Sequence, residues 1–158
     1  MSVSLGQPIP DFTASATDGL TVQLAELRGH RVVLYFYPRD NTPGCTVEGQ
    51  QFRDLHDRFA ALKTIVFGVS RDSLHSHENF RTKQGFPFQL ISDSDESLCK
   101  LFDVIKLKKL YGKESLGVER STFLIDSDGT LRRAWRKVKV DGHAENVLAA
   151  VEALPAIA

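Results

Sequence analysis

The sequence around residue 45 combines residue types that could support thiol chemistry. It reads YFYPRDNTPGCTVEG over residues 35–49 and contains Cys45, one of only two cysteines in 158 residues. An apolar run of strand length ends just before Pro38, and apolar residues with helical spacing begin after Cys45. A cysteine at the start of a helix lies where unpaired backbone N–H groups favour an anion, so its position predicts reactivity.

The reactive form of a cysteine is the thiolate, whereas a free cysteine is mostly protonated at neutral pH. Three features favour the thiolate of Cys45. It lies in the first turn of its expected helix, the hydroxyl of Thr42 is within reach of the sulfur or of a bound oxygen, and Arg120, at the start of a strand, could add a fixed positive charge. Pro38 and Pro43 remove backbone donors and stiffen the loop, which shields the sulfur. We expect Cys45 to be a nucleophile rather than a small helix-start residue.

The longer segment FYPRDNTPGCTVEGQQFRD resembles the active-site signature of the peroxiredoxins, in the bacterioferritin comigratory protein or peroxiredoxin Q branch. The resemblance covers nearly the whole chain, through GQPIPDF, FPFQLISD, KKLYGKESLGVERSTFLID and WRKVKVDGHAENVL. It implies a thioredoxin-like fold. It also implies a thiol-specific peroxidase that reduces hydrogen peroxide and organic hydroperoxides to water and alcohols.

The same resemblance assigns roles to individual residues. Cys45 is the peroxidatic cysteine, which a peroxide converts to a sulfenic acid, and Pro38 shields it. Thr42 and Arg120 bind and polarise the peroxide oxygens. Glu48, three positions after the cysteine, orients the arginine. No metal or organic cofactor is implied.

The chain departs from this branch at the second, resolving cysteine. Gln50 stands where many members carry it, five positions after Cys45, and Arg81 stands where others carry it in the following helix. The other thiol, Cys99, lies in an apolar helical patch, which predicts a small buried hydrophobic residue. We therefore expect a one-cysteine peroxidase whose sulfenic acid is reduced by thioredoxin, glutaredoxin or a small thiol. A two-cysteine peroxidase with Cys99 as the resolving cysteine is the alternative.

Two further classes of function have weaker support. A general thiol–disulfide oxidoreductase would need two nearby cysteines, and neither cysteine belongs to a C-x-x-C pair. A non-catalytic binding module is suggested only by the segment from Val104 to Val140, which holds ten Lys or Arg against four Asp or Glu. Peroxide consumption by the chain with and without Cys45 separates these classes.

Composition and charge argue against other partners. The formal net charge is zero, so no global field attracts nucleic acid. No apolar run approaches the roughly 18 residues of a membrane helix, and no signal peptide is visible at the start. We expect a single domain over residues 1–158, cytoplasmic and monomeric.

Strand and helix patterns alternate through the middle of the chain, which indicates an α/β protein. Strands are expected at 11–17, 20–24, 31–37, 64–70, 88–91, 121–125 and 130–138. Helices are expected at 45–62, 73–84, 96–102 and 143–154. The basic segment 105–117 cannot be assigned to either type. The patterns predict a thioredoxin-like fold, with a mixed central sheet, helices on both faces and an N-terminal β-hairpin at Asp18-Gly19.

Two weaker motifs have simpler interpretations. His75 and His77 are two residues apart on a helix and point in different directions, so we expect solvated surface histidines rather than a metal site. The segment from Asp126 to Gly129 lacks the later ligands of a calcium loop and is expected to be a hairpin turn.

Overall fold

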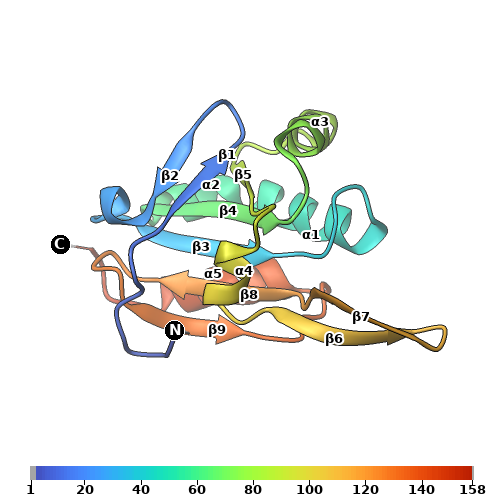
Figure 1. Cartoon of the computed structure of the whole chain (residues 1–158). Coiled ribbons are helices and arrows are strands. Elements are labelled where there is room, and N and C mark those ends of the chain that lie inside the picture. The colour runs from blue at the N-terminus through green and yellow to red at the C-terminus, as the bar shows by residue number, and fades with distance from the viewer. Residues whose placement is uncertain (1–2, 158) are drawn as a thin grey trace.

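A seven-stranded mixed sheet forms the centre of the computed structural model, which describes residues 3–157 (Figure 1). The strand order is β2-β1-β5-β4-β3-β8-β9. The strands are β1 Thr13–Ala16, β2 Thr21–Gln23, β3 Arg31–Phe36, β4 Thr64–Ser70, β5 Gln89–Ser92, β8 Ser121–Ile125 and β9 Leu131–Trp135. Strands β3, β4 and β5 run parallel, and β8 pairs antiparallel with β3. The thioredoxin-like architecture predicted from the sequence is confirmed.

Strand β3 lies inside the sheet, and all six of its residues are buried. Val32, Leu34 and Phe36 belong to one hydrophobic cluster, whereas Val33 and Tyr35 belong to the other. Alternate residues of a strand point to opposite faces, so a continuous apolar run requires both faces to be covered. The sheet therefore separates two cores.

Helices cover the two faces unequally. They are α1 Pro43–Asp54, α2 His56–Ala61, α3 Leu74–Gln84, α4 Ser97–Leu101 and α5 His143–Glu152, with a 3₁₀ turn, η1, at Leu24–Leu27. Helices α1, α2, α3 and α5 contribute to the cluster that contains Tyr35. On the other face, α4 packs with N-terminal residues such as Ile9 around Phe36.

Two elements differ in extent from the sequence-based expectation. The single helix expected over 45–62 is two helices, because Leu55 adopts φ −99° and ψ 2° and ends α1; Phe52 and Phe59 stay buried on either side of the break. The strand expected over 130–138 ends at Trp135. Two residues later, Lys137 has a positive φ of 49°, which extended backbone does not adopt.

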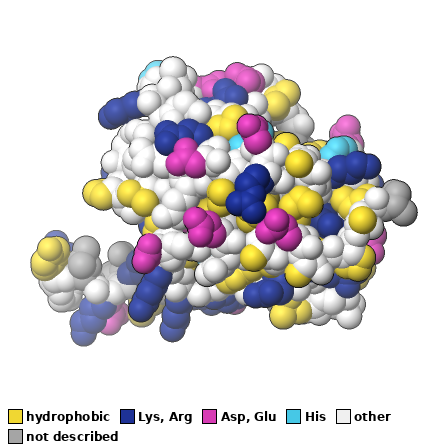
Figure 2. All heavy atoms as spheres, turned by 180° about the vertical axis from the view of Figure 1, so that it is seen from behind, with side chains coloured by type: hydrophobic (Ala, Val, Ile, Leu, Met, Phe, Trp, Pro, Cys, Tyr) yellow, Lys and Arg dark blue, Asp and Glu magenta, His cyan; other side chains and the backbone are white. Residues whose placement is uncertain are grey.

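The basic segment 105–117, which the sequence patterns leave unassigned, forms most of a second, separate hairpin. Strands β6 Ile105–Leu110 and β7 Lys113–Val118 pair antiparallel and extend beyond the main sheet (Figure 1). Leu107 pairs with Leu116, and both side chains are exposed. Figure 2 shows Lys and Arg side chains along this projection. An apolar pair without a core gives no clear periodicity, which explains why the sequence pattern does not reveal the strands.

No helix within the described range 3–157 is long and apolar enough to cross a membrane.

His143 begins α5 and is buried against the main sheet. Its Nε2 lies 2.7 Å from Thr122 Oγ1, and its ring meets those of Phe52 and Trp135 edge to face. Burial, with a smaller effect of the positive charge of Arg120, lowers the pKa of His143 from 6.5 to about 4. The imidazole is therefore neutral in the folded protein at pH 7.

This shift predicts a specific loss of stability in acid. Between pH 6.5 and pH 4 the unfolded chain protonates His143 while the folded chain does not, so the free energy of unfolding falls as the pH falls through this window. In His143→Gln we expect a smaller decrease between pH 7 and pH 5 than in the wild type, measured by urea unfolding at both pH values. His75→Gln, at an exposed position, should keep the wild-type dependence. An unchanged pH dependence in His143→Gln would contradict the assignment.

Candidate active site

Cys45 is the third residue of α1, in the turn that follows the loop after β3. Thr42 is the N-cap residue with extended backbone, and Pro43 occupies the first helical position, where its missing N–H costs no hydrogen bond. The first-turn amides of a helix lack helical acceptors, and this end of α1 therefore favours negative charge. The side chain is only 2% exposed. The local sequence therefore places Cys45 at a helix N-terminus, and packing buries its thiol.

Arg120 connects the sulfur to a buried carboxylate. It directly precedes β8, and its Nη2 donates to Cys45 Sγ at 3.4 Å while its Nη1 donates to Glu48 Oε1 at 2.6 Å. Glu48 is one helical turn after Cys45, so both face the guanidinium. A Cβ at Gly44 would lie 3.2 Å from Nη2, so the glycine leaves room for the arginine over the first turn. The planar guanidinium of Arg120 thus donates hydrogen bonds to Cys45 and Glu48 at the same time.

In the ion pair of Glu48 and Arg120, burial disfavours the charged form of each group, whereas the charge of its partner favours it. The side chain of Glu48 is fully buried, which raises its pKa to about 7 although Arg120 acts in the opposite direction. Burial disfavours the charge of Arg120, but the negative charges of Glu48 and Cys45 outweigh it and raise the arginine pKa. Glu48 Oε2 has no hydrogen-bond partner within residues 3–157. Arg120 is thus a fixed positive charge beside the sulfur.

Thr42 and Pro38, the two loop residues predicted for the site, precede Cys45 in the sequence and do not contact its sulfur in the same way as Arg120. Thr42 is half-buried, and its hydroxyl donates to Arg39 O at 2.9 Å rather than to the sulfur. Pro38 is also half-buried and borders a depression of about 500 Å³. That depression is further lined by Arg39, Arg71, Asp72, Ser94 and Glu96.

Cys99 lies on the other side of the sheet from Cys45. It is fully buried in α4, within the cluster that contains Phe36, whereas Cys45 belongs to the cluster of Tyr35. Its backbone N–H donates to Asp93 Oδ2 at 2.7 Å. Burial, reinforced by Asp93, raises the pKa of the Cys99 thiol well above its ordinary value. The structure does not bring the two cysteines together.

Lys108 is a site neighbour that the sequence did not identify. Its Nζ donates to Val118 O at 2.6 Å, two residues before Arg120, and its aliphatic chain packs over Gly117. Burial lowers the pKa of Lys108, as do the charges of Arg120 and Arg71, while that of Cys45 acts in the opposite sense. Lys108 lies in the basic segment 105–117, which has no helix or strand periodicity, so the sequence indicates the charge of this residue but not its position.

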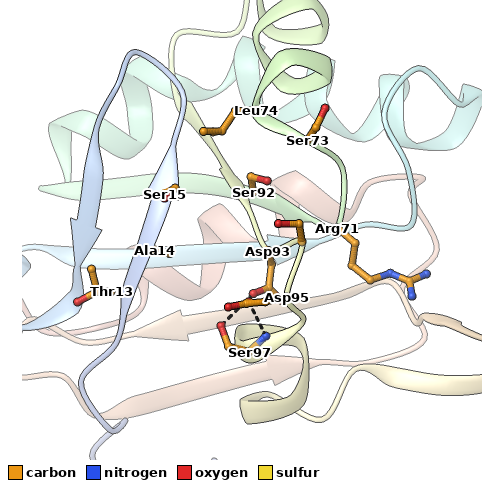
Figure 3. Close-up of a pocket in the computed structure, with 11 residues that line it drawn as sticks. Thr13, Ala14, Ser15, Arg71, Ser73, Leu74, Ser92, Asp93, Asp95 and Ser97 are labelled. Atoms are coloured by element: carbon orange, nitrogen blue, oxygen red, sulfur yellow. Dashed lines mark hydrogen bonds between the residues drawn. The ribbon is translucent and has the colours of Figure 1, made fainter.

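A pocket of about 470 Å³ opens elsewhere, between β1, β5 and the start of α3 (Figure 3). It is lined mainly by hydroxyl and carboxylate side chains, and none of the candidate site residues borders it. Asp93 and Asp95 beside it accept hydrogen bonds from Ser97. These contacts hold the start of α4 and present no arrangement for thiol chemistry.

A thioredoxin-like sheet with a buried thiol at a helix N-terminus, bonded to an arginine, defines a thiol-dependent redox protein. Comparisons with known proteins identify the family. The model of the AhpC/TSA family matches residues 5–134. Peroxiredoxin Bcp of Xanthomonas campestris is 54% identical over 143 residues, covering 90% of this chain and 89% of the relative. Peroxiredoxin Bcp of Bacillus subtilis is 49% identical over 148 residues, covering 94% of each.

Solved structures agree with these relatives. A cysteine-to-serine mutant of Xylella fastidiosa PrxQ superposes with a TM-score of 0.91 at 44% identity, covering 97% of this chain and 98% of that one. The bacterioferritin comigratory protein of Xanthomonas campestris gives a TM-score of 0.86 at 53% identity, covering 90% of each chain. The chain belongs to the AhpC/TSA family. Within it, the chain is a peroxiredoxin of the bacterioferritin comigratory protein, or peroxiredoxin Q, branch, and its function is that of a thiol peroxidase.

The double contact of Arg120 predicts that a lysine cannot replace it. A single ammonium lacks the two separated nitrogens that reach Cys45 and Glu48, so we expect Arg120→Lys to lower the second-order rate of oxidation by peroxide at least tenfold, about 1.4 kcal/mol. Arg132→Lys, at an exposed position of β9, is the matched control. Stopped-flow oxidation with hydrogen peroxide measures both. A lysine variant as fast as the wild type would exclude a specific role for the guanidinium.

Proposed function

We propose that Cys45 is the peroxidatic cysteine of this thiol peroxidase. The observation that carries the proposal is the contact between Arg120 Nη2 and Cys45 Sγ at 3.4 Å, at the N-terminus of α1. Both the arginine and the helix amides place hydrogen-bond donors and positive potential at the reacting sulfur. Cys99 is also the third residue of a helix, but Asp93 and Asp95 accept hydrogen bonds from the first-turn N–H groups there, and burial together with Asp93 favours the protonated thiol.

The reaction at Cys45 is a nucleophilic displacement. The thiolate attacks one oxygen of a hydroperoxide, an S–O bond forms as the O–O bond breaks, and the departing hydroxide or alkoxide takes a proton to become water or alcohol. Cys45 is left as a sulfenic acid. Negative charge shifts from sulfur to the leaving oxygen, so fixed donors around both atoms lower the barrier.

Four neighbouring residues provide this environment in our proposal. Arg120 donates to the reacting sulfur and to the peroxide oxygens, and Glu48 holds its guanidinium in place. The hydroxyl of Thr42 turns from Arg39 O to a peroxide oxygen when substrate binds. Pro38 limits the access of water to the sulfur.

The distribution of the two thiols supports a one-cysteine cycle. Cys45 and Cys99 lie in separate cores on opposite faces of the sheet, and a disulfide needs Cα atoms within about 7 Å. An external thiol therefore attacks the sulfenic acid, releases water and forms a mixed disulfide, which a second thiol reduces. Thioredoxin, glutaredoxin or a small thiol would serve as the reductant. Because Cys45 is almost fully buried, the loop or the first turn of α1 must open for this step.

The substrates are hydrogen peroxide and organic hydroperoxides. The bacterioferritin comigratory protein of Xanthomonas campestris, which is 53% identical to this chain, has alkyl peroxide reduction activity. We propose further that the chain acts as one domain over residues 1–158, as a monomer in the cytoplasm. No metal or organic cofactor takes part in the proposed steps.

Replacement of Cys45 tests the assignment directly. Cys45→Ser should abolish peroxide consumption with dithiothreitol as reductant and retain the wild-type fold, because a serine hydroxyl fits the space but is not ionised. Peroxide consumption and circular dichroism are measured on the same samples, with Cys99→Ser as the control. Appreciable turnover in Cys45→Ser would refute the proposal.

The fate of the oxidised cysteine tests the one-cysteine cycle. After one equivalent of hydrogen peroxide and a dimedone trap, we expect the intact mass to show a single adduct on Cys45, and Cys99→Ser to turn over within twofold of the wild type. A loss of two hydrogens without an adduct, together with an inactive Cys99→Ser, would show instead that Cys99 resolves the sulfenic acid.

A further inference from the structure

Asp40 is a buried acid in the middle of the active-site loop. Its neighbours Arg39 and Asn41 are exposed, yet the Asp40 side chain is 1% exposed. Tyr37 donates its hydroxyl to Asp40 Oδ1 at 2.6 Å, and Ser76 Oγ donates to Oδ2 at 2.8 Å. The loop thus turns a carboxylate inward, where a charge without partners is strongly disfavoured.

The principal partner of Asp40 is His77, which the sequence had placed on the surface. That expectation is wrong: His77 is fully buried on the inner side of α3, and only His75 is exposed. The Nδ1 of His77 lies 2.7 Å from Asp40 Oδ2, and its Nε2 lies 2.9 Å from Ile91 O. Helical spacing correctly separated the two histidines but could not show which one faces the core.

Both ring nitrogens of His77 face acceptors, which determines where the protons lie. Ile91 O can only accept, so Nε2 must carry a hydrogen. Asp40 Oδ2 already accepts from Ser76, and a bare Nδ1 would place two lone pairs 2.7 Å apart, so a proton lies on that line as well. The contacts therefore place one hydrogen on Nε2 toward Ile91 O and another between Nδ1 and Asp40 Oδ2, which joins the two side chains by a short buried hydrogen bond.

Hydrogen bonding explains this cluster better than a metal ion does. Ligand atoms of Asp40, Asp72 and His77 lie within 4.8 Å of one another. However, Asp72 Oδ2 accepts from the backbone N–H of Asp40 at 2.9 Å and from Ser70 Oγ at 2.5 Å. Both Asp40 oxygens take part in hydrogen bonds as well, and the hydrogen bond between Asp40 Oδ2 and His77 Nδ1 leaves no free lone pair on that nitrogen for a cation.

We propose that Asp40 and His77 are positioning residues for peroxide reduction, a buried hydrogen-bonded pair that holds the loop from Pro38 to Thr42 in its reactive geometry. Asp40 lies two residues after Pro38 and two before Thr42. Its side chain ties the loop to α3, and its backbone N–H ties the loop to Asp72. Fixing the centre of so short a loop fixes both ends relative to Cys45, which suits residues that must contact peroxide to within a fraction of an ångström.

This inference rests on the proposed function of Cys45, but it makes a separate prediction. The pair acts on the loop, whereas Arg120, Glu48 and the helix amides act on the sulfur. Loss of the pair should therefore reduce the reaction with peroxide, which needs the loop, much more than alkylation of the same sulfur. Unfolding or a general loss of order would change both rates.

The experiment compares two rates at Cys45 in Asp40→Asn and His77→Gln, at one pH. One is oxidation by hydrogen peroxide and the other is alkylation by iodoacetamide, both followed by peptide mass spectrometry. We expect each variant to lose at least tenfold in oxidation and less than twofold in alkylation. Thr42→Val should show the same selective loss. His75→Gln, on the exposed side of α3, should match the wild type in both.

Two additional measurements keep the test independent of folding. Each single variant leaves one buried polar group without its partner, so the double variant Asp40→Asn/His77→Gln should regain part of the oxidation rate. In ¹⁵N spectra of the wild type, Nε2 of His77 should carry a hydrogen, and the Nδ1 signal should change in Asp40→Asn. Wild-type oxidation rates in both single variants, parallel losses in both reactions, or an Nδ1 signal that does not respond to Asp40→Asn would overturn the inference. A wild type that is not oxidised at Cys45 would instead refute the proposed function.

Discussion

The bridge that Arg120 forms between Cys45 and Glu48 is the contact on which the site depends. One planar group donates to a sulfur at 3.4 Å and to a buried carboxylate oxygen at 2.6 Å. Burial of Glu48 is unfavourable enough to raise its pKa to about 7, and the arginine is the partner that offsets this cost. Glu48 in turn holds the guanidinium at the position where the positive charge of Arg120 acts on the Cys45 thiol. A side chain at Gly44 would contact that guanidinium, because a Cβ there would lie 3.2 Å from Nη2.

The sheet gives the two cysteines different chemistry. Strand β3 sends alternate side chains to two cores, and Cys45 and Cys99 lie in different ones. Cys45 has an arginine beside its helix N-terminus, whereas Cys99 has a carboxylate and apolar surroundings that favour its neutral form. In the proposed cycle, this layout activates Cys45 toward peroxide and keeps Cys99 unreactive. The proposed sulfenic acid would then have no internal partner, so the cycle would require access for an external thiol.

A cluster of hydrogen-bonded polar side chains lies beneath the loop that precedes Cys45. Asp40, Asp72 and His77 form hydrogen bonds among β3, β4 and α3 that apolar packing could not direct. Buried polar networks that are fully paired favour one arrangement over others, because a displacement leaves a buried polar group without a partner. The active-site loop therefore has a defined position even though its outer residues, Arg39 and Asn41, face solvent.

The sequence by itself determined the features that depend on neighbours along the chain. An apolar strand, a loop with Pro38 and Thr42, and the place of Cys45 in the first turn of a helix are local properties, and they were predicted correctly together with the fold class, although α1 begins at Pro43. Tertiary structure decided the rest. The contact of Arg120 joins residues 75 apart in the chain, and the burial of His77 depends on Asp40, 37 positions earlier. Spacing along a helix tells which residues share a face, but only packing tells which face becomes the interior.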